Sequence, residues 1–312
     1  MKISICIPTY KRPQLVIEAI NSCLNQTYPP SEIIIGDDSP DNTTMIAVEK
    51  LKKKSAIPIK YLHNKPGLGQ MANTNKLFDS ISGDKVMLLH DDDQIVPDAL
   101  ESLINVFTNN PDVQITFGKQ YIMTDDGEIS LERSKIFNDS YFRIEKNEGS
   151  ILTALESGVG QQFPNNGYLM DRHIVEKIKF RNYGFGDDLG NGCEYDFGLR
   201  LGIEGYKMYF LNKFTAKYRV AENSMSQSKS GDSGYQSFRI LKDFKVNTTF
   251  AEKIRQQRLY ERAPIAITQA IHIGKRKEAF SIYFSRWYRK RILSIGGLKR
   301  FVYLFIGKNQ IK

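Results

Sequence analysis

Short apolar runs rich in β-branched residues alternate with helix-like stretches through the first 118 residues. The runs, each a predicted strand, are residues 3–7, 32–36, 57–63, 85–90 and 113–118. The stretches between them, each a predicted helix, are residues 13–25, 42–53, 70–81 and 97–109. This alternation predicts an α/β fold with a mostly parallel sheet flanked by helices on both faces. Ligands bind such sheets at the carboxyl ends of the strands.

The second half of the chain is less regular. Residues 119–170 predict strands and loops with one helix near 149–157. Residues 194–204 predict a further helix that ends at Gly205, and residues 208–211 and 215–220 predict two strands. The segment 221–234 is rich in Ser, Gly and Asn and is predicted to be a mobile loop. From residue 235 to 312 the chain reads as helical and increasingly basic.

The charge of the 312 residues is unevenly placed. The formal net charge is +9, and residues 279–312 hold eight basic residues and no Asp or Glu, which leaves 9 − 8 = +1 for the rest. Three cysteines, Cys6, Cys23 and Cys193, stand far apart and predict neither a disulfide framework nor a zinc site. The sequence opens directly on a predicted strand and has no apolar run of membrane-spanning length. We therefore expect a cytoplasmic protein, at most peripheral on the inner face of a membrane.

Three adjacent carboxylates, Asp91, Asp92 and Asp93, follow His90 at the end of the fourth predicted strand. Adjacent carboxylates repel one another unless a cation or water neutralises them. Hard oxygen ligands at this position suit Mg²⁺ or Mn²⁺, which keep open positions for substrate phosphates. The alternative is a solvated acidic turn that caps the helix starting near Pro97.

Polar residues also follow the first two predicted strands. Pro8-Thr9-Tyr10-Lys11-Arg12 comes after the first, where backbone N–H groups near a helix start can hold a phosphate or a base edge. Asp37 and Asp38 come after the second, where a carboxylate can accept hydrogen bonds from a base or a ribose. Ordinary helix caps explain either feature equally well.

Taken together, these segments resemble the inverting family 2 glycosyltransferases, which have the GT-A fold. The segments that carry the resemblance are residues 5–12, 22–28, 32–39, 64–75 and 91–93. The resemblance covers residues 1–220 and implies a catalytic domain there. Its nucleotide-sugar-binding half would be residues 1–118 and its acceptor-binding half residues 119–220, with a basic helical appendage at 235–312.

The resemblance also implies roles for particular residues. The donor would be bound by residues of the strand-end loops: Pro8, Thr9, Tyr10, Arg12, Asp38, Asn75, Asp91 and Asp92. Asp93 would bind the divalent metal, Mg²⁺ or Mn²⁺. The catalytic base would be Glu194, with Asp196 and Asp188 as rivals. An acidic residue in the first turn of a helix, favoured by the helix dipole, is the alternative reading of Glu194.

The sequence departs from the family pattern at one expected metal ligand. Family members often have a His after the last strand of the sheet, and Ala221 stands at the matching position here. Metal binding is then expected to rely on Asp93 and the donor diphosphate, or to recruit Glu222 or Asn223.

The expected activity is metal-dependent transfer from a nucleotide sugar, a UDP-sugar, to a hydroxyl group with inversion. The expected acceptor is a carbohydrate, lipid-linked or protein-linked molecule in the synthesis of a surface polysaccharide or glycoconjugate. A dinucleotide fingerprint at residues 67–72 favours a dehydrogenase, but it follows the third strand instead of the first. A non-enzymatic protein that binds nucleic acid or membrane is the other alternative. Because the basic charge lies outside the α/β body, no nucleic-acid partner is expected.

The basic tail suggests a membrane surface as a further partner. Residues 279–312 combine clustered Arg and Lys with aromatic and aliphatic neighbours, which suits an interfacial position on anionic lipid. The alternative is a helical appendage that packs on the body or on a second subunit of a homo-oligomer.

Overall fold

The computed structural model of the chain describes residues 1–181, 192–220 and 233–305. The chain divides into two compact units. The first comprises Met1–Arg181 with Phe197–Val220 and carries the sheet, whereas the second comprises Asn182–Asp196 with Ala221–Lys312 and its described part is helical. The boundary falls within one helix, between Asp196 and Phe197.

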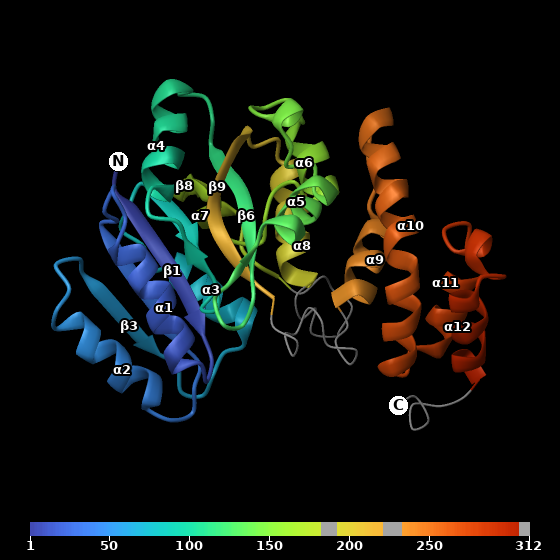
Figure 1. Cartoon of the computed structure of the whole chain (residues 1–312), viewed down its shortest axis with the longest axis horizontal. Coiled ribbons are helices and arrows are strands. Elements are labelled where there is room, and N and C mark those ends of the chain that lie inside the picture. Colours follow the sequence, from blue (N-terminus) through green and yellow to red (C-terminus); the bar gives the residue numbers. More distant parts are fainter. Residues whose placement is uncertain (182–191, 221–232, 306–312) are drawn as a thin grey trace. The chain divides into compact units, whose positions relative to one another are not determined.

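The described part of the first unit contains a nine-stranded sheet (Figure 1). Its strands are β1 (Ile3–Thr9), β2 (Glu32–Asp37), β3 (Ile59–His63), β4 (Lys85–Leu88), β5 (Gln94–Ile95), β6 (Ile115–Met123), β7 (Ile129–Ser130), β8 (Leu169–Asp171) and β9 (Met208–Arg219). They are ordered β3-β2-β1-β4-β8-β6-β9-β5, and β7 pairs with β6. Strands β1, β2, β3, β4, β6 and β9 run in one direction, and only β5, β7 and β8 oppose them. The predicted α/β fold with a mostly parallel sheet is therefore confirmed.

Helices connect and cover these strands. Those of the first unit are α1 (Pro13–Leu24), α2 (Thr43–Lys52), α3 (Gln70–Phe78), α4 (Ala99–Asn109), α5 (Leu131–Ser140), α6 (Ala154–Gly160) and α7 (Arg172–Lys177), with a 3₁₀ turn at Glu145–Asn147. Helix α8 (Gly192–Ile203) contains the boundary between the units. The helices α1 to α4 were predicted from the sequence within a few residues of their ends.

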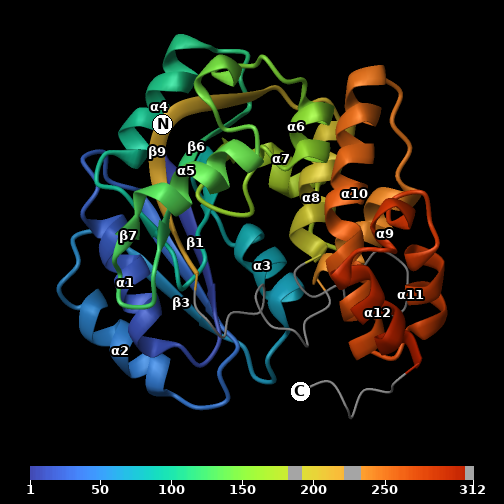
Figure 2. The same ribbon diagram turned by 45° about the vertical axis from the view of Figure 1, so that its right-hand side comes forward.

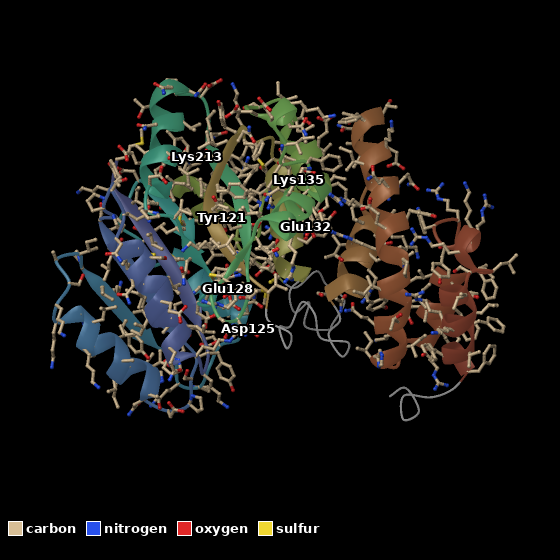
Figure 3. All side chains as sticks on the ribbon, in the orientation of Figure 1. Tyr121, Asp125, Glu128, Glu132, Lys135 and Lys213 are labelled. Atoms are coloured by element: carbon tan, nitrogen blue, oxygen red, sulfur yellow. The ribbon has the colours of Figure 1, made fainter. Side chains whose placement is uncertain are left out.

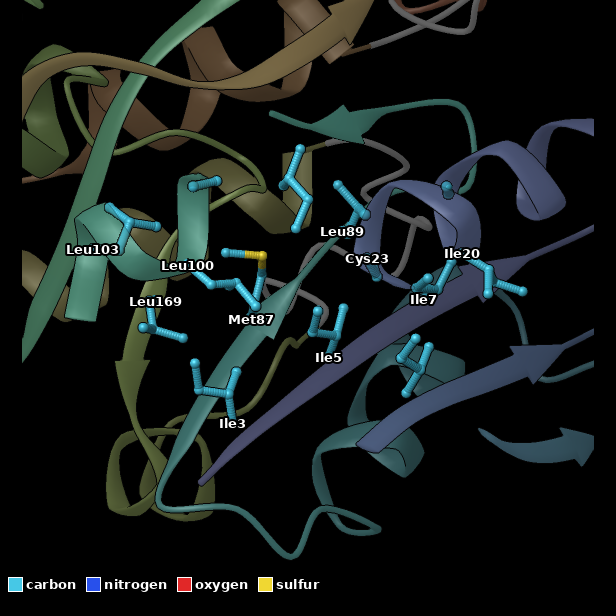
Figure 4. Packing of buried hydrophobic residues seen from close by; sticks show 14 of the residues in the cluster. Ile3, Ile5, Ile7, Ile20, Cys23, Met87, Leu89, Leu100, Leu103 and Leu169 are labelled. Atoms are coloured by element: carbon cyan, nitrogen blue, oxygen red, sulfur yellow. The ribbon is translucent and has the colours of Figure 1, made fainter. Parts of the chain in front are cut away.

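The pleat of β1 sorts its side chains between two helical layers. Ile3, Ile5 and Ile7 alternate with Ser4 and Cys6, and the three isoleucines are fully buried in one core. That core also takes the apolar faces of α1 and α4 and Met87 of β4 (Figure 4). Because successive strand residues face opposite sides, Ser4 and Cys6 face the helical layer on the other side of the sheet. This two-sided burial explains why the strand is apolar along most of its length.

Helix α3 lies close against the other face of the sheet. A Cβ added to Gly36 of β2 would fall 2.1 Å from Oδ1 of Asn73 in α3, so this position tolerates no side chain. Next to it, Phe78 packs against Phe180 and Phe197, whose own ring centroids are 4.6 Å apart. The close approach of α3 places its N-terminus beside the carboxyl ends of β2 and β3.

The second half of the sheet differs from the prediction. Residues 208–211 and 215–220 were predicted as two strands, but they form the single strand β9, which pairs with β6 through an irregular register near Lys119. Strand β8 inserts between β4 and β6 in the antiparallel direction and was not predicted. Pro97 was predicted in the first turn of a helix, whereas α4 begins two residues later at Ala99. Short strands such as β5 and β8 have too few residues to show a period in sequence.

The described part of the second unit is built from helices. They are α9 (Ser233–Asp243), α10 (Thr249–His272), α11 (Arg276–Tyr283) and α12 (Ile295–Phe305), with a 3₁₀ turn at Arg289–Arg291. The predicted helical C-terminal region is thus confirmed up to residue 305, and residues 306–312 lie outside the described residues. Of the predicted mobile loop, residues 221–232 lie outside the described residues, and residues 233 and 234 begin α9. None of the helices described is long and apolar enough to cross a membrane.

Candidate active site

Polar loops follow β1, β2, β3 and β4, which are neighbours and run parallel. Their carboxyl ends therefore meet at one edge of the sheet, where ligands bind in open α/β folds. The backbone N–H of Asp38, after β2, donates to the carbonyl of Thr9 at the end of β1 (3.1 Å). The loops are thus joined to one another and do not extend separately into solvent.

The acidic turn after β4 is bound to the loop after β1. The hydroxyl of Thr9 donates to Oδ2 of Asp91 (2.7 Å). The guanidinium of Arg12 donates from Nη1 to Oδ1 of Asp91 (3.0 Å) and to Oδ2 of Asp92 (2.9 Å). Burial and the neighbouring charge of Asp92 raise the pKa of Asp91. The alternative of a solvated turn that caps the next helix is wrong, because Asp91 and Asp93 are buried and the N-cap of α4 is Asp98.

Asp93 is the most enclosed carboxylate of the turn. Its Oδ1 accepts the backbone N–H of Arg219 (2.8 Å), and its Oδ2 accepts a hydrogen bond from the amide of Asn166 (2.8 Å). Nδ1 of His90 lies 3.8 Å from the same Oδ2. Burial, followed by the negative charge of Asp92, raises the pKa of Asp93 to about 7. The two hydrogen bonds and His90 therefore offset only part of the cost of burying the charged form of Asp93.

The residues around Asp93 fit a divalent cation. Ligand atoms of His90, Asp92 and Asp93 lie within 4.8 Å of one another. Within the described parts of the chain, neither Lys nor Arg forms an ion pair with Asp93. The Oδ1 atom of buried Asn166, whose amide nitrogen contacts Asp93, has no hydrogen-bond partner there. Carboxylate ligands suit both Mg²⁺ and Mn²⁺. His90 and Asp92 therefore join the predicted metal ligand, Asp93, in a candidate set of three residues.

Asp38 organises the loop that follows β3. Its Oδ1 accepts from the amide of Asn64, and its Oδ2 accepts the backbone N–H of Gly69 (2.8 Å each). A Cβ on Gly67 would lie 2.9 Å from the carbonyl oxygen of Asp38, so this segment packs closely on it. Each carboxylate oxygen retains a second lone pair, and donor binding by Asp38 stays a prediction.

Tyr10 and Lys11 form the outer part of the loop after β1. The Tyr10 side chain is 54% exposed, whereas its neighbour Thr9 is buried. Lys11 has a φ of 56°, in the left-handed region, and its N–H donates to the hydroxyl of Ser39 (2.8 Å). A non-glycine residue in this region costs about 1 kcal/mol. The loop is therefore held in a specific shape with an aromatic ring at its surface. Donor binding by Tyr10 and Pro8 stays a prediction.

Asn75, predicted to bind the donor, has a structural partner. Its Nδ2 donates to the carbonyl of Phe180 and its Oδ1 accepts the N–H of Phe180, both at 2.9 Å. The amide therefore fixes the chain just before residue 182 and leaves one Nδ2 hydrogen and one oxygen lone pair. Its role toward a donor stays a prediction.

Glu194 and Asp196, the candidate bases, lie near the start of α8, and both are buried. The part of α8 in the first unit packs closely on α6, because a Cβ on Gly158 or Gly202 would meet backbone atoms of the facing helix at 2.7 Å. The direction of α8 in that unit is thereby fixed. The assignment of a catalytic base stays a prediction. The rival base Asp188 and the recruits Glu222 and Asn223, like Ala221, lie outside the described residues.

Arg219, at the end of β9, was not singled out from the sequence. Its guanidinium donates to the carbonyl of Asp92 (2.9 Å) and to that of Asp125 (2.6 Å), which lies in the turn after β6 (Figure 3). It also forms an ion pair with Glu18 of α1 (2.6 Å). Together with the N–H that binds Asp93, these contacts hold the acidic turn against β9. Neither Arg219 nor Asn166 belongs to a motif, so only their position in the fold reveals them.

Replacing Arg219 by Met is expected to lower the free energy of unfolding by about 2 kcal/mol or more. The substitution keeps an apolar stem but leaves carbonyls near the acidic turn without a donor. Urea denaturation would measure the loss. Arg133→Met on exposed α5 is the matched control and is expected to change stability by less than about 0.5 kcal/mol. Equal stability of Arg219→Met and the unmodified protein would show that the contacts of the Arg219 guanidinium do not stabilise the fold.

The mostly parallel sheet with an acidic turn at the carboxyl edge of its strands is similar to the GT-A fold of the solved TarS structures. The sequence model of Glycosyl transferase family 2 matches residues 4–161, about half of the chain. The chain therefore belongs to glycosyl transferase family 2.

Known relatives agree with this assignment. The chain is 25% identical over 230 residues to an uncharacterized glycosyltransferase of Methanocaldococcus jannaschii, which covers 73% of this chain and 74% of the relative. It is 34% identical over 103 residues, 33% of either chain, to the GalNAc(5)-diNAcBac-PP-undecaprenol beta-1,3-glucosyltransferase of Campylobacter jejuni. In fold it is similar to residues 1–349 of TarS of S. aureus, solved with UDP-GlcNAc, at 18% identity and a TM-score of 0.58 over 97% of this chain and 80% of that segment.

Proposed function

We propose that this glycosyltransferase transfers a sugar from a UDP-sugar to a hydroxyl acceptor with inversion, in the synthesis of a surface polysaccharide or glycoconjugate. The observation that carries the proposal is the acidic turn bound by Thr9 and Arg12, with Asp93 buried behind it. This arrangement supports the proposal, because the loops that would bind the donor and the carboxylates that would bind a metal lie at one edge of the sheet. The UDP-GlcNAc complex of TarS supports the choice of donor.

The nucleotide would lie on the loops after β1 and β2. The exposed ring of Tyr10 offers a stacking surface for a base, and Asp38 offers carboxylate lone pairs to a base N–H or to ribose. Arg12 would remain between the acidic turn and the donor, because its guanidinium has donors beyond the two bonds it makes to Asp91 and Asp92.

A divalent cation would be held by Asp93 with Asp92 and His90. When bound, it supplies positive charge that stabilises the departing nucleoside diphosphate. The chain itself supplies the rigid placement of these ligands, through Asn166 and the backbone of Arg219. Asp91 would not be one of these ligands, because Thr9 and Arg12 already engage its two carboxylate oxygens.

The acceptor hydroxyl would be deprotonated by Glu194, with Asp196 as the alternative base. Attack on the anomeric carbon from the face opposite the diphosphate inverts its configuration. General-base catalysis of this kind contributes typically about 10²–10⁴-fold. The named acceptor of the Campylobacter relative carries undecaprenol, which supports a lipid-linked acceptor for this chain.

Asp38→Ala is expected to weaken UDP binding by roughly 10-fold or more, the value of a hydrogen bond to a charged group. Calorimetric titration with UDP in the presence of Mn²⁺ would measure it. Asp41→Ala is the control, because Asp41 lies in the same loop but is exposed, and its hydrogen bonds to described residues go to Thr43. Unchanged UDP affinity in folded Asp38→Ala would remove this residue from the donor site.

A further inference from the structure

Helix α12 of the second unit has an apolar face that the described residues of this unit leave largely exposed. The side chains of Leu298, Val302 and Phe305 are 55%, 47% and 61% exposed, and they recur at helical spacing along one side. Ile295 and Phe301 extend the same side and are also exposed. We name this set of five residues the α12 apolar face. A contiguous apolar face of this kind marks an interaction site more often than a scattered exposed residue does.

Helix α12 packs against α10 and α11 of its own unit (Figure 2). This packing buries the side of α12 opposite to the α12 apolar face. Gly297 and Leu304 are buried there. The hydroxyl of Tyr283, in α11, donates to the carbonyl of Gly297 (3.1 Å). The guanidinium of Arg300 donates to the carbonyl of Pro264 in α10 (3.0 Å). These contacts fix the rotation of α12 against α10 and α11. The rings of Phe301 and Phe305 touch Tyr283 and Phe280 of α11 at the edge of the α12 apolar face and keep their other sides exposed.

Basic residues accompany this face. Arg289 and Lys290 are exposed in the 3₁₀ turn before α12, and Lys299 is exposed on α12 itself. Leu293, between that turn and the helix, is 88% exposed. The sequence from residue 279 to 312 contains no Asp or Glu. None of Arg289, Lys290 and Lys299 forms a salt bridge with another described residue, so the face and its neighbours combine apolar side chains with positive charge.

This combination fits an anionic lipid surface better than a second copy of the chain. A two-fold dimer through the α12 apolar face would bring the basic residues of both copies to one interface, and like charges brought close together repel. Basic residues beside an exposed apolar face on a helix are instead the composition of helices that lie in a membrane interface. With 11 residues, α12 is too short to span a bilayer.

We propose that the α12 apolar face and Leu293 insert into the surface of an anionic bilayer, with Arg289, Lys290 and Lys299 at the lipid headgroups. The inference goes beyond the proposed transfer reaction, and its observations belong entirely to the second unit. It explains why hydrophobic side chains are placed on the outside of a helix whose inner side is already packed. A catalytic unit attached to such a surface would meet acceptors carried on lipid.

Flotation of the full chain with vesicles tests this proposal. Vesicles of phosphatidylcholine alone are compared with vesicles that also contain phosphatidylglycerol. We expect the protein to float with the anionic vesicles only, and raised salt to weaken the binding. Leu298→Gln with Val302→Gln and Phe305→Gln is expected to reduce the bound fraction at limiting lipid by about tenfold or more. Lys290→Glu with Lys299→Glu is expected to act in the same direction.

The matched control is Leu131→Gln with Ile136→Gln, which removes two equally exposed apolar residues from α5 of the first unit. This control is expected to float like the unmodified protein. UDP binding is expected to stay unchanged in every variant, so failure of the membrane proposal is distinguishable from failure of the proposed activity. Absence of flotation, or equal flotation of the triple variant, would overturn the proposal. A dimer that the triple variant dissociates, without lipid binding, would assign the face to a second copy.

Discussion

Asp93→Asn is expected to abolish metal-dependent sugar transfer while the protein stays folded. The substitution removes the charge that would hold the cation, and we expect turnover to fall by about 10³-fold or more. Folding is expected to survive because the new amide oxygen can still accept the N–H of Arg219. Asn166 can also turn its unpartnered oxygen toward the new amide, so the local hydrogen bonds can be restored.

Release of nucleoside diphosphate from the donor measures this loss, and circular dichroism checks the fold. Asp125→Asn is the control, since Asp125 is an exposed acid whose described contact to the site is made through its backbone carbonyl. It is expected to keep full activity. If the unmodified enzyme retained full turnover in EDTA, the metal would have no place in the mechanism.

Glu194→Gln is expected to keep donor affinity and to lose transfer by roughly 10²-fold or more, the size of a general-base contribution. The amide preserves the shape of the side chain at the start of α8 but cannot accept a proton from the acceptor hydroxyl. UDP affinity, measured by calorimetry, separates this effect from a collapse of the donor site. Because the acceptor is not known, the rate of transfer is measured as hydrolysis of the donor, with water in place of the acceptor.

Asp196→Asn is the companion variant, since Asp196 lies in the same helix and is equally enclosed. We expect it to retain more activity than Glu194→Gln. Full transfer by Glu194→Gln with loss in Asp196→Asn would move the base to Asp196. Full transfer by both would direct attention to Asp188.

The first half of the fold could be predicted because its pattern is strong and repetitive. The buried strands β1 and β2 are continuous apolar runs, and α1 begins at Pro13, where proline suits a first helical turn. The second half of the fold could not be predicted in the same way, because the positions of its strands depend on pairing with strands distant in the sequence. Strand β8 has only three residues, and its insertion between β4 and β6 is decided by the partners and not by its own sequence.

The candidate site was predicted in its location but not in its internal contacts. Strand ends identified Thr9, Arg12 and the acidic turn, and the structure joins them by hydrogen bonds. The supports of Asp93 come from Asn166 and Arg219, more than 70 residues away along the chain. Single asparagines and arginines carry no periodic signal, so only folding brings them to the site.

Calorimetric titration of the full chain with nucleoside diphosphates, in Mn²⁺ and then in EDTA, tests the central claim most directly. This measurement requires no knowledge of the acceptor. It measures both the affinity of the donor site for the nucleotide and the dependence of that affinity on the metal. We expect UDP to bind in Mn²⁺, to bind much more weakly in EDTA, and to lose its metal dependence in Asp93→Asn. The absence of binding by any nucleoside diphosphate in Mn²⁺, with the protein folded, would contradict the assignment of a metal-dependent donor site to this edge of the sheet.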